Sequence, residues 1–442
     1  MDIFIKISQL LLSLSILVIF HEAGHFIAAK IFKTRVEKFY LFFNPWFSLF
    51  KFKKGETEYG IGWLPLGGYV KISGMIDESM DKEQMKLPPQ PWEFRSKPAW
   101  QRLIIMLGGV TVNVLLAMAI YVVMLSTWGE KYLPTSEANK YGVVCDSLAM
   151  EMGLQNGDKI ISIDNEEVED FLKIPVKLIL DEAKSIQIIR DNQNINIKIP
   201  KGIIGKLVKK KTPDFLFVQF PFEVKKFTDN SPAKAAGLQI NDKIIALNGE
   251  SKQYFDEFYN EIQKHKNEEV TVTALRNTDT VYINVTVPEQ GLLGVYHKDL
   301  SNYFTYKEKN YSFVEAIPAG ISKAYTGIGN YLKQLKLLFS PEVQAYKSVG
   351  GFITIGNIFP ATWDWESFWR LTAFLSIMLA ILNVLPIPAL DGGHVMFLLY
   401  EIIARRKPSD KFLEYSQILG MIILFSLLIL ANGNDIIRLF NK

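Results

Sequence analysis

Two histidines and a glutamate lie close together near the start of the chain, in the order His21-Glu22-Ala-Gly-His25. On a helix, positions i and i+4 share one face, so the two imidazoles can hold one metal ion. Glu22 is then turned aside, where it can act on a water molecule at the metal. These three side chains are the only ionisable ones between residues 7 and 29. Charged groups in an apolar span are costly and mark function, so the pattern predicts zinc-dependent hydrolysis within a membrane segment.

A catalytic zinc usually takes three protein ligands and a water molecule, so a third ligand is needed. The chain has a single cysteine, Cys145, which leaves His, Asp and Glu as ligand types. Asp391 ends an apolar run that also contains Pro386 and Pro388. Prolines break a helix, and irregular backbone at membrane depth must be buried in protein or line a wet cavity. We therefore expect Asp391 to complete the site.

A second interpretation of the two histidines stays open at this point. In a soluble-type zinc peptidase, the third ligand would be a glutamate that follows the motif, and the candidates are Glu37, Glu56 and Glu58. That interpretation does not explain the apolar runs of the chain.

The composition is that of membrane spans joined to polar domains. The chain has 442 residues, of which 49% are hydrophobic and 21% charged, and its net charge of +3 gives no indication of nucleic-acid binding. Four runs with little or no charge exceed or approach the roughly 20 residues that a bilayer requires, at 7–29, 103–129, 371–390 and 415–434. The first run lacks a small-residue cleavage site, so we expect no cleaved signal peptide.

The distribution of basic residues predicts how the chain threads through the membrane. Arg405, Arg406, Lys407 and Lys411 lie in the short connection between the third and fourth runs, and short basic connections stay in the cytoplasm. Residues 30–102 would then also be cytoplasmic, and 130–370 would lie outside. Both halves of the candidate metal site would fall towards the cytoplasmic ends of their spans.

The segment from 43 to 74 is rich in aromatic and β-branched residues on both sides of a turn at Lys54-Gly55-Glu56. This arrangement predicts a β-hairpin. A free edge of the hairpin could pair with an unwound substrate by strand addition, and Gly67 and Gly68 lie in the Gly-rich half of this segment. A hairpin that only lies on the membrane surface is the alternative.

The outer segment contains an internal repeat. Residues 153–165 and 237–249 are identical at seven of thirteen positions, with the copies 84 residues apart. This spacing favours two small domains over a solenoid. The repeated pattern, with Ser231-Pro232-Ala233 before the second copy, resembles the PDZ domains of bacterial proteases. PDZ domains bind extended peptides along a strand edge.

The two metal-site motifs together resemble the site-2 protease family of intramembrane zinc metalloproteases, and more narrowly its bacterial regulator-of-sigma-E type. His21-Glu22-Ala-Gly-His25 is similar to the first family motif, and the run from Asn383 through Pro386, Pro388 and Asp391 is similar to the second. The resemblance implies that the two histidines and Asp391 bind Zn²⁺ and that Glu22 is the general base.

A third family motif, Gly-Pro-x-x-Asn, is only partly matched. Gly109 and Asn113 keep their places in the second run, but valine replaces the proline. The resemblance implies that Asn113 and Asn383 contact substrate or polar groups near the site. An asparagine that only links helices is the alternative. With these two, we take Gly67, Gly68, Pro386 and Pro388 as candidate substrate-binding residues.

We therefore expect a polytopic α-helical membrane protein with four transmembrane helices, a membrane-associated β-hairpin and two extracytoplasmic PDZ domains. The expected segments are 1–30, 31–102, 103–129, 130–220 and 221–300 (the PDZ pair), 301–367 (amphipathic, gating), 368–392, 393–414 (cytoplasmic loop), 415–434 and 435–442. The expected function is intramembrane cleavage of pre-trimmed single-span substrates, such as anti-sigma factors or remnant signal peptides, in the bacterial inner membrane. The alternative is a non-catalytic membrane PDZ adaptor for envelope proteins.

Overall fold

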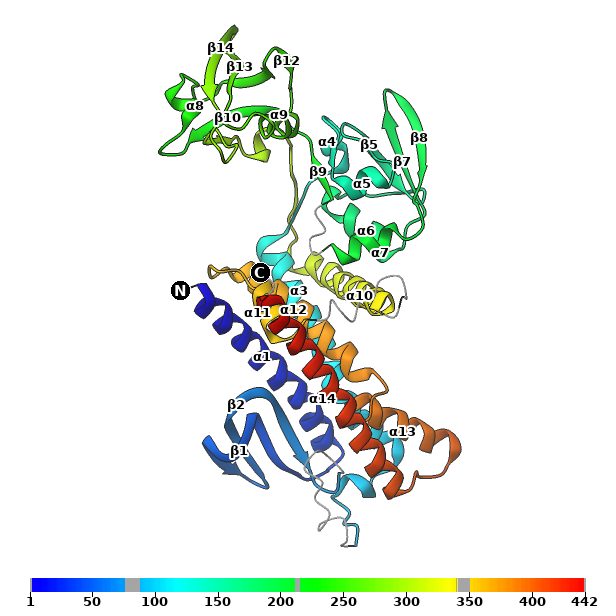
Figure 1. Cartoon of the computed structure of the whole chain (residues 1–442). Coiled ribbons are helices and arrows are strands. Elements are labelled where there is room, and N and C mark those ends of the chain that lie inside the picture. Colours follow the sequence, from blue (N-terminus) through cyan, green and yellow to red (C-terminus); the bar gives the residue numbers. More distant parts are fainter. Residues whose placement is uncertain (1, 76–87, 211–214, 339, 341–349, 441–442) are drawn as a thin grey trace. The chain divides into compact units, whose positions relative to one another are not determined.

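The computed structural model describes residues 2–75, 88–210, 215–338, 340 and 350–440. The chain divides into two compact units. One contains residues 1–129, 310–338 and the C-terminal part of the chain, and the other contains residues 130–309. Each unit is described by itself below (Figure 1).

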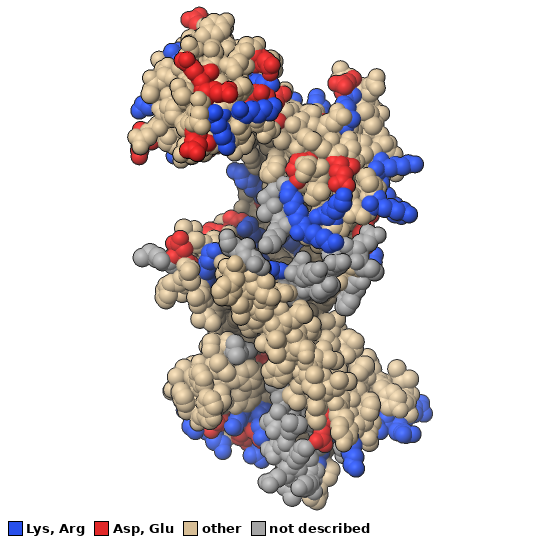
Figure 2. Space-filling view, viewed as in Figure 1, with Lys and Arg blue, Asp and Glu red and all other residues tan. Residues whose placement is uncertain are grey.

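The first unit is a bundle in which four helices are long and apolar enough to cross a membrane. They are α1 (Asp2–Ile31), α3 (Ala99–Trp128), α12 (Trp365–Val384) and α14 (Asp410–Phe440). All four agree with the predicted spans, although each begins earlier. The surface of this bundle is almost free of charged residues over its middle, and Lys and Arg gather at the end that carries the hairpin (Figure 2).

Helix α3 lies at the centre of the bundle, because it packs against α1, α10, α12 and α13. The crossing of α1 and α3 is very close. A Cβ atom on Gly24 would lie 2.2 Å from the carbonyl oxygen of Gly108, so both positions need a residue without a side chain. Small residues that let helix backbones touch are the usual means of packing in membranes. This contact brings the metal-binding face of α1 against α3.

The predicted hairpin is present as two long antiparallel strands, β1 (Val36–Lys54) and β2 (Thr57–Ile72), which lie beside the C-terminal half of α1 (Figure 1). Their register is not that of a simple hairpin. Residues 36–41 face both 68–72 and 58–61, while 48–54 face 57–62. Each strand therefore folds back on itself, and the hairpin becomes a sheet of four segments.

The third predicted span extends too far in the sequence-based assignment. Helix α12 ends at Val384, and a new helix, α13 (Asp391–Ala404), begins after a short turn. Pro386 and Pro388 explain the break, since proline lacks the amide hydrogen that a helix needs. The segment 393–414, predicted as a cytoplasmic loop, is helical for most of its length. Helix α13 packs against α3, and its Leu398 is buried in the cluster that includes Ile105 and Met106 of α3.

Two further helices precede α12. Helix α10 (Phe313–Leu338) packs against α3 and α12, and the shorter α11 (Phe352–Ile358) contacts α1 and α14. Asp435 of α14 accepts hydrogen bonds from the backbone amides of Gly351 and Thr354. The amphipathic segment predicted at 301–367 is thus largely helical where it is described, but residues 339 and 341–349 of it lie outside the described part.

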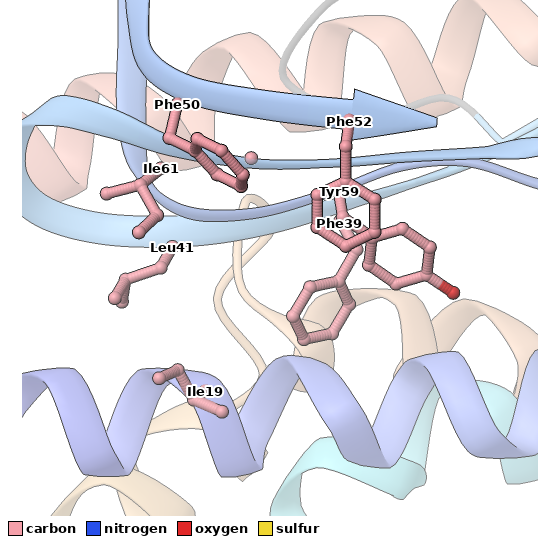
Figure 3. Close-up of a pocket in the computed structure, with 8 residues that line it drawn as sticks. Ile19, Phe39, Leu41, Phe50, Phe52, Tyr59 and Ile61 are labelled. Atoms are coloured by element: carbon pink, nitrogen blue, oxygen red, sulfur yellow. The ribbon is translucent and has the colours of Figure 1, made fainter. Parts of the chain in front are cut away.

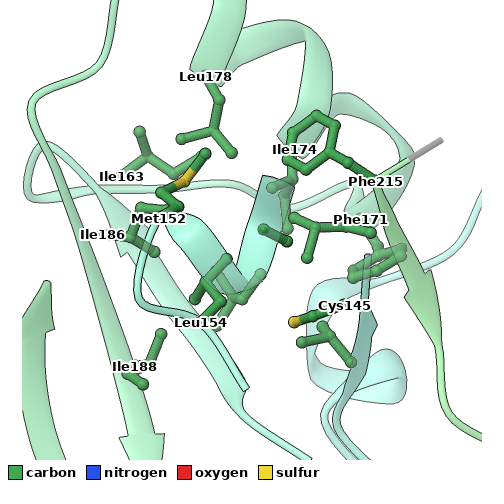
Figure 4. Close-up of a cluster of buried hydrophobic side chains, with 14 of the residues drawn as sticks. Cys145, Met152, Leu154, Ile163, Phe171, Ile174, Leu178, Ile186, Ile188 and Phe215 are labelled. Carbon is green, nitrogen blue, oxygen red and sulfur yellow. The ribbon is translucent and has the colours of Figure 1, made fainter. Parts of the chain in front are cut away.

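The second unit contains two modules, each with its own hydrophobic core. The core of the first is built from buried residues such as Met152, Ile186 and Phe215 (Figure 4). Its elements are β3 (Glu130–Tyr132), α4 (Thr135–Ala138), β4 (Val143–Cys145), α5 (Ser147–Glu151), β5 (Lys159–Ile163), β6 (Glu166–Glu167), η2 (Phe171–Lys173), α6 (Ile174–Leu180), β7 (Ser185–Arg190), β8 (Gln193–Lys198), α7 (Ile203–Lys209) and β9 (Leu216–Val218).

The second module repeats the order of elements that begins at β4 in the first, except that η2 and α7 have no counterpart. Its elements are β10 (Phe222–Phe227), α8 (Pro232–Ala235), β11 (Lys243–Leu247), β12 (Glu250–Ser251), α9 (Phe255–Ile262), β13 (Glu269–Arg276), β14 (Asp279–Thr286) and β15 (Val295–His297). In each module a late strand returns to pair with the first, β9 with β4 and β15 with β10. After η3 (Leu300–Asn302), the chain leaves through β16 (Lys307–Lys309), which pairs with β3.

An ion pair with a buried aspartate occurs at matching positions of the two modules. Arg190 binds the carboxylate of Asp158 and also the backbone carbonyl of Gly153. Arg276 binds Asp242 and the carbonyl of Gly237 in the same way. The two aspartates are those that align in the sequence repeat, so the repeated residues fix the same turn in both modules.

Candidate metal centre

His21 and His25 lie on one face of α1, as their spacing predicts, and both side chains are buried. Their Nε2 atoms are 3.3 Å apart. Asp391 reaches the same point from the first residue of α13, and its Oδ2 atom lies 3.2 Å from each Nε2. Within the described residues, these three form the only group of His, Cys, Asp or Glu side chains arranged to hold a metal ion.

The distances fit a tetrahedral zinc ion. With bonds of about 2.0–2.1 Å, such an ion separates its ligand atoms by about 3.3 Å, which matches all three measured distances. Asp391 Oδ2 is buried and has no hydrogen-bond partner, although two ring nitrogens face it. Two imidazoles and one carboxylate are a common ligand set of catalytic zinc. The residues present therefore fit Zn²⁺.

Helix α3 holds both imidazoles from behind, through three residues spaced four apart. The backbone carbonyl oxygen of Ile105 lies 2.8 Å from Nδ1 of His25, and Nδ2 of Asn113 lies 3.2 Å from Nδ1 of His21. Gly109 lies between them. A Cβ atom there would be 2.4 Å from Nε2 of His25 and 2.7 Å from the ring of His21. Because both Nδ1 atoms have partners on α3, both Nε2 atoms are directed at the metal position.

The turn before Asp391 is fixed by close contacts with its own helices and with α14. Ala389 has a left-handed backbone with φ of 83°, and its amide donates to Oε1 of Gln417 at 3.2 Å. A Cβ atom on Gly420 would meet the carbonyl oxygen of Pro388 at 1.6 Å, so α14 touches this turn backbone to backbone. Gly392 likewise has no room for a side chain, because the carbonyl oxygen of Leu385 would be 2.2 Å away.

The far end of α13 is held by a charged pair that was not predicted. Arg102 of α3 donates to Glu401 of α13 at 2.5 Å and to the carbonyl of Lys97 at 2.9 Å, and both charged side chains are largely buried. The pair ties the helix that carries Asp391 to the helix that supports the histidines. Two opposite charges 299 positions apart give no local sequence signal of this contact.

Glu22 lies on a different face of α1 from the histidines, towards the sheet. Its carboxylate lies beside the backbone of Val70 in β2. One turn on, Phe26 packs edge-to-face against Phe39 and Tyr59 of the sheet. Between α1 and the sheet lies an open pocket of about 280 Å³, lined by aliphatic and aromatic side chains that include Ile19 (Figure 3). Ile19 and Glu22 are three residues apart on α1, so the pocket adjoins the turn of the helix that carries Glu22.

The remaining predicted site residues lie at different places around the centre. Asn383, at the end of α12, is partly exposed, and its Nδ2 lies 3.5 Å from Nε2 of His21. Asn113 is fully buried. Gly68 lies against Val18 of α1, where a Cβ atom would come within 2.6 Å of the valine. Gly67 lies against Phe43 of the sheet, and no measured contact joins it to the metal residues.

The glutamates considered as alternative third ligands lie elsewhere. Glu37 bonds to Ser73 and Lys71, Glu58 bonds to Tyr40, and Glu56 is exposed at the turn of the hairpin. None of the three belongs to the described metal-binding group, which contains Asp391 instead. The soluble-type arrangement is therefore not the one that the fold assembles.

Comparison with known proteins agrees with this geometry. Residues 9–427 match the sequence pattern of Peptidase family M50. A Vibrio cholerae protein named "Putative zinc metalloprotease" is 28% identical over 473 residues, covering 99% of this chain and 100% of that protein. A Campylobacter jejuni protein with the same description is 29% identical over 445 residues, covering 98% and 93%.

A third relative has a more specific name. The "Regulator of sigma E protease" of Haemophilus influenzae is 27% identical over 465 residues, covering 98% of this chain and 99% of that protein. The family match extends over nearly the whole chain, and the four apolar helices accord with a membrane location. The chain belongs to peptidase family M50, the site-2 proteases, and is a zinc metalloprotease of the membrane.

Proposed function

We propose that this protease cuts single-span membrane proteins within or beside their transmembrane segment, with zinc held by His21, His25 and Asp391. The observation that carries the proposal is the position of the three ligand atoms, which meet between helices that are otherwise apolar over their length. A soluble substrate would not reach such a site easily, whereas a transmembrane helix is already at the right depth.

The proposed chemistry divides between the metal and Glu22. Bound zinc would polarise the scissile carbonyl group and make water more acidic. Glu22 would accept the proton of the attacking water and pass it to the leaving amine, as a general base and then a general acid. Its carboxylate is suited to this role because it lies close to the three ligands without belonging to them, beside the backbone of Val70.

The sheet beside α1 would hold the substrate. In the described register, residues 68–72 pair with 36–41 on one side and have no paired strand on the other. The same segment passes Glu22 at Val70. A substrate that unwinds locally could add as a strand along this edge, which would bring a peptide bond near the carboxylate. The apolar pocket beside Ile19 would then receive an aliphatic or aromatic side chain of the substrate. Apolar lining is what a transmembrane sequence requires.

We infer the orientation of the chain in the membrane from the distribution of charged residues. The turn of the hairpin carries exposed Lys51, Lys53 and Lys54, and the connection after α13 carries exposed Arg405 and Arg406. Basic residues at one end of the spans favour the cytoplasm for that end. The metal centre would then open towards the cytoplasmic half of a bacterial inner membrane, and residues 130–309 would lie outside the cell membrane.

The two outer modules would act as PDZ domains that select substrates. Their returning strands β9 and β15 each pair on one side with the first strand of the module, which leaves an edge where an extended peptide could add. We propose that they exclude proteins whose bulky outer domain is still attached. Anti-sigma factors and remnant signal peptides would then be suitable substrates, and the name of the Haemophilus relative supports the first of these.

A non-catalytic membrane adaptor is the alternative function. It would use the two outer modules and need no metal. The complete ligand set, and the glycine and carbonyl contacts that α3 provides for it, favour the protease.

The test is to map the cut. The full chain is reconstituted in liposomes with a single-span substrate that lacks a folded outer domain, and the products are identified by mass spectrometry. We expect a cut inside the apolar segment, in its cytoplasmic half, that is abolished by a zinc chelator and restored by added zinc. Cuts confined to the polar flanks would overturn intramembrane cleavage, and the absence of any cut would favour the adaptor.

A further inference from the structure

Asn113 combines three properties that its place in the sequence does not explain. Its side chain is 0% exposed, in the middle of α3. Its Nδ2 atom lies 3.2 Å from Nδ1 of His21, and its Oδ1 atom is buried with no hydrogen-bond partner. A buried amide oxygen without a partner is uncommon, because its desolvation costs about 1–3 kcal/mol.

The chemistry of the neighbouring imidazole indicates which end of the amide should face it. A neutral histidine that gives the lone pair of Nε2 to a metal carries its proton on Nδ1, so Nδ1 must donate. His25 meets this requirement, because its Nδ1 faces the carbonyl oxygen of Ile105 at 2.8 Å. At His21 the equivalent partner is Asn113, and only its Oδ1 atom can accept a hydrogen bond.

A half-turn of the amide about its last side-chain bond exchanges Oδ1 and Nδ2 at almost the same positions. After that turn, Oδ1 accepts the proton of His21 Nδ1 and is no longer without a partner. The backbone carbonyl of Asn113 already accepts from Ser376 of α12 at 2.8 Å, so the helix around it does not need to move. One rotation thus gives the buried oxygen a partner and orients the ring of His21, while Nδ2 takes the position that Oδ1 held.

We propose that Asn113 is the positioning residue of His21, whose Oδ1 atom accepts the Nδ1 proton and directs Nε2 to the zinc ion. This inference depends on the ligand set of the proposed function. Helix α3 then positions both histidine ligands. Ile105 positions His25, and eight residues later Asn113 positions His21. The two asparagines also have different roles, because Asn383 is partly exposed and lies on the side of Nε2 rather than Nδ1.

Two other roles for Asn113 fit the contacts less well. Direct contact with substrate requires exposure, and Asn113 has none. A link between helices through the amide requires a partner on another helix, and in the described part of the chain the only such partner of the amide is His21 itself.

The test measures zinc affinity on the full chain in detergent, by competition with a chromogenic chelator. Asn113→Leu keeps the size of the side chain but removes the acceptor, and Asn113→Asp keeps the acceptor. Loss of an outer partner of a metal ligand typically weakens binding about 10–100-fold, so we expect that loss for leucine and recovery to within a few-fold for aspartate. Thr111→Val, at an exposed position of the same helix, is the matched control and should bind zinc normally.

Each outcome decides the matter. Normal zinc affinity in Asn113→Leu, or equal weakness in the leucine and aspartate variants, would overturn the inference. If Asn113→Leu does not fold, as judged by the thermal unfolding of the metal-free proteins, the wild type with cobalt in place of zinc is examined by NMR. A solvent-protected Nδ1 proton on His21 supports the inference, and its absence overturns it. His21→Ala serves as the reference: if it leaves the affinity unchanged, the ligand set of the proposed function is what fails.

Discussion

Gly109 offers the sharpest test of how α3 builds the metal centre. In Gly109→Ala, the new Cβ atom would lie 2.4 Å from Nε2 of His25 and 2.7 and 2.8 Å from two ring atoms of His21. Non-bonded atoms normally keep about 3.5 Å, so the His25 ring would have to retreat by about 1 Å. Both rings are buried and cannot swing into open space.

A displacement of that size exceeds what the metal allows. Ligand distances at a zinc site hold to within about 0.2 Å, and a misplacement of 1 Å in an active site can cost about 100-fold in rate. We expect Gly109→Ala to lose most of its zinc and to cleave at least about 100-fold more slowly. The measurements are zinc per chain, by elemental mass spectrometry after gel filtration, and the initial rate on a transmembrane substrate.

The matched control is Gly433→Ala in α14, where nothing lies within 4 Å of the new atom. Replacing glycine by alanine inside a helix otherwise stabilises it by about 0.5–1 kcal/mol, so this variant should retain full zinc and activity. If Gly109→Ala also retains full zinc and cleaves within about threefold of the wild type, the imidazoles do not pack on α3 as described.

Three further predictions concern other parts of the molecule. Asp391→Asn should lower zinc occupancy together with activity, and full zinc with a small loss of rate would show that the third ligand is elsewhere. Burial raises the pKa of Asp242, but hydrogen bonds from Arg276 and a backbone amide outweigh burial and hold that pKa below its usual range. Asp242→Asn should therefore destabilise the second module by about 2–3 kcal/mol at neutral pH. The difference from wild type should begin to shrink as the pH falls below about 4 and should vanish once the pH has passed the lowered folded pKa. Hydrogen exchange measures this difference, with exposed Asp229→Asn as control. Because β3 and β16 pair, residues 133–306 can be replaced by a short glycine linker. The shortened protein should then cut a substrate with a folded outer domain that the full chain rejects. Loss of cleavage of a short substrate would instead indicate that the two modules recruit substrates.

The linkage in the Asp242 prediction has a definite sign. A carboxylate whose pKa is lowered by folding stabilises the fold at any pH above its unfolded pKa, near 3.9. That stabilisation disappears as the pH falls through the lower folded value. A difference between the variant and wild type that grew on acidification would contradict the role of the Arg276 pair.

Local sequence patterns predicted much of this molecule. The apolar runs identify the spans, and the spacing of His21 and His25 places them on one face of α1. The turn at Gly55 marks the hairpin, because the residues on either side favour strands. The prolines at 386 and 388 correctly interrupt a helix, and Asp391 lies directly after the interruption.

Contacts between distant segments could not be predicted. The sequence predicts a loop where α13 lies, and the packing of this helix against α3 has no local sequence signal. The turn before Asp391 is contacted by Gln417 and Gly420, and the helix that follows it is bound by Arg102. All three residues lie on other helices and belong to no sequence motif. The contact of Asn113 with His21 likewise depends on the crossing of α1 and α3. Gly24 and Gly108 create that crossing, and two single glycines do not reveal it.

The central claim is that a metal centre and a separate carboxylate work together within the membrane, and Glu22→Gln tests it most directly. The variant is loaded with zinc, its metal content is verified, and its rate on a reconstituted transmembrane substrate is compared with that of the wild type. The ligands are unchanged and only proton transfer is removed, so we predict full zinc and a rate lower by about 10²–10⁴-fold. Full zinc with an undiminished rate would contradict the account.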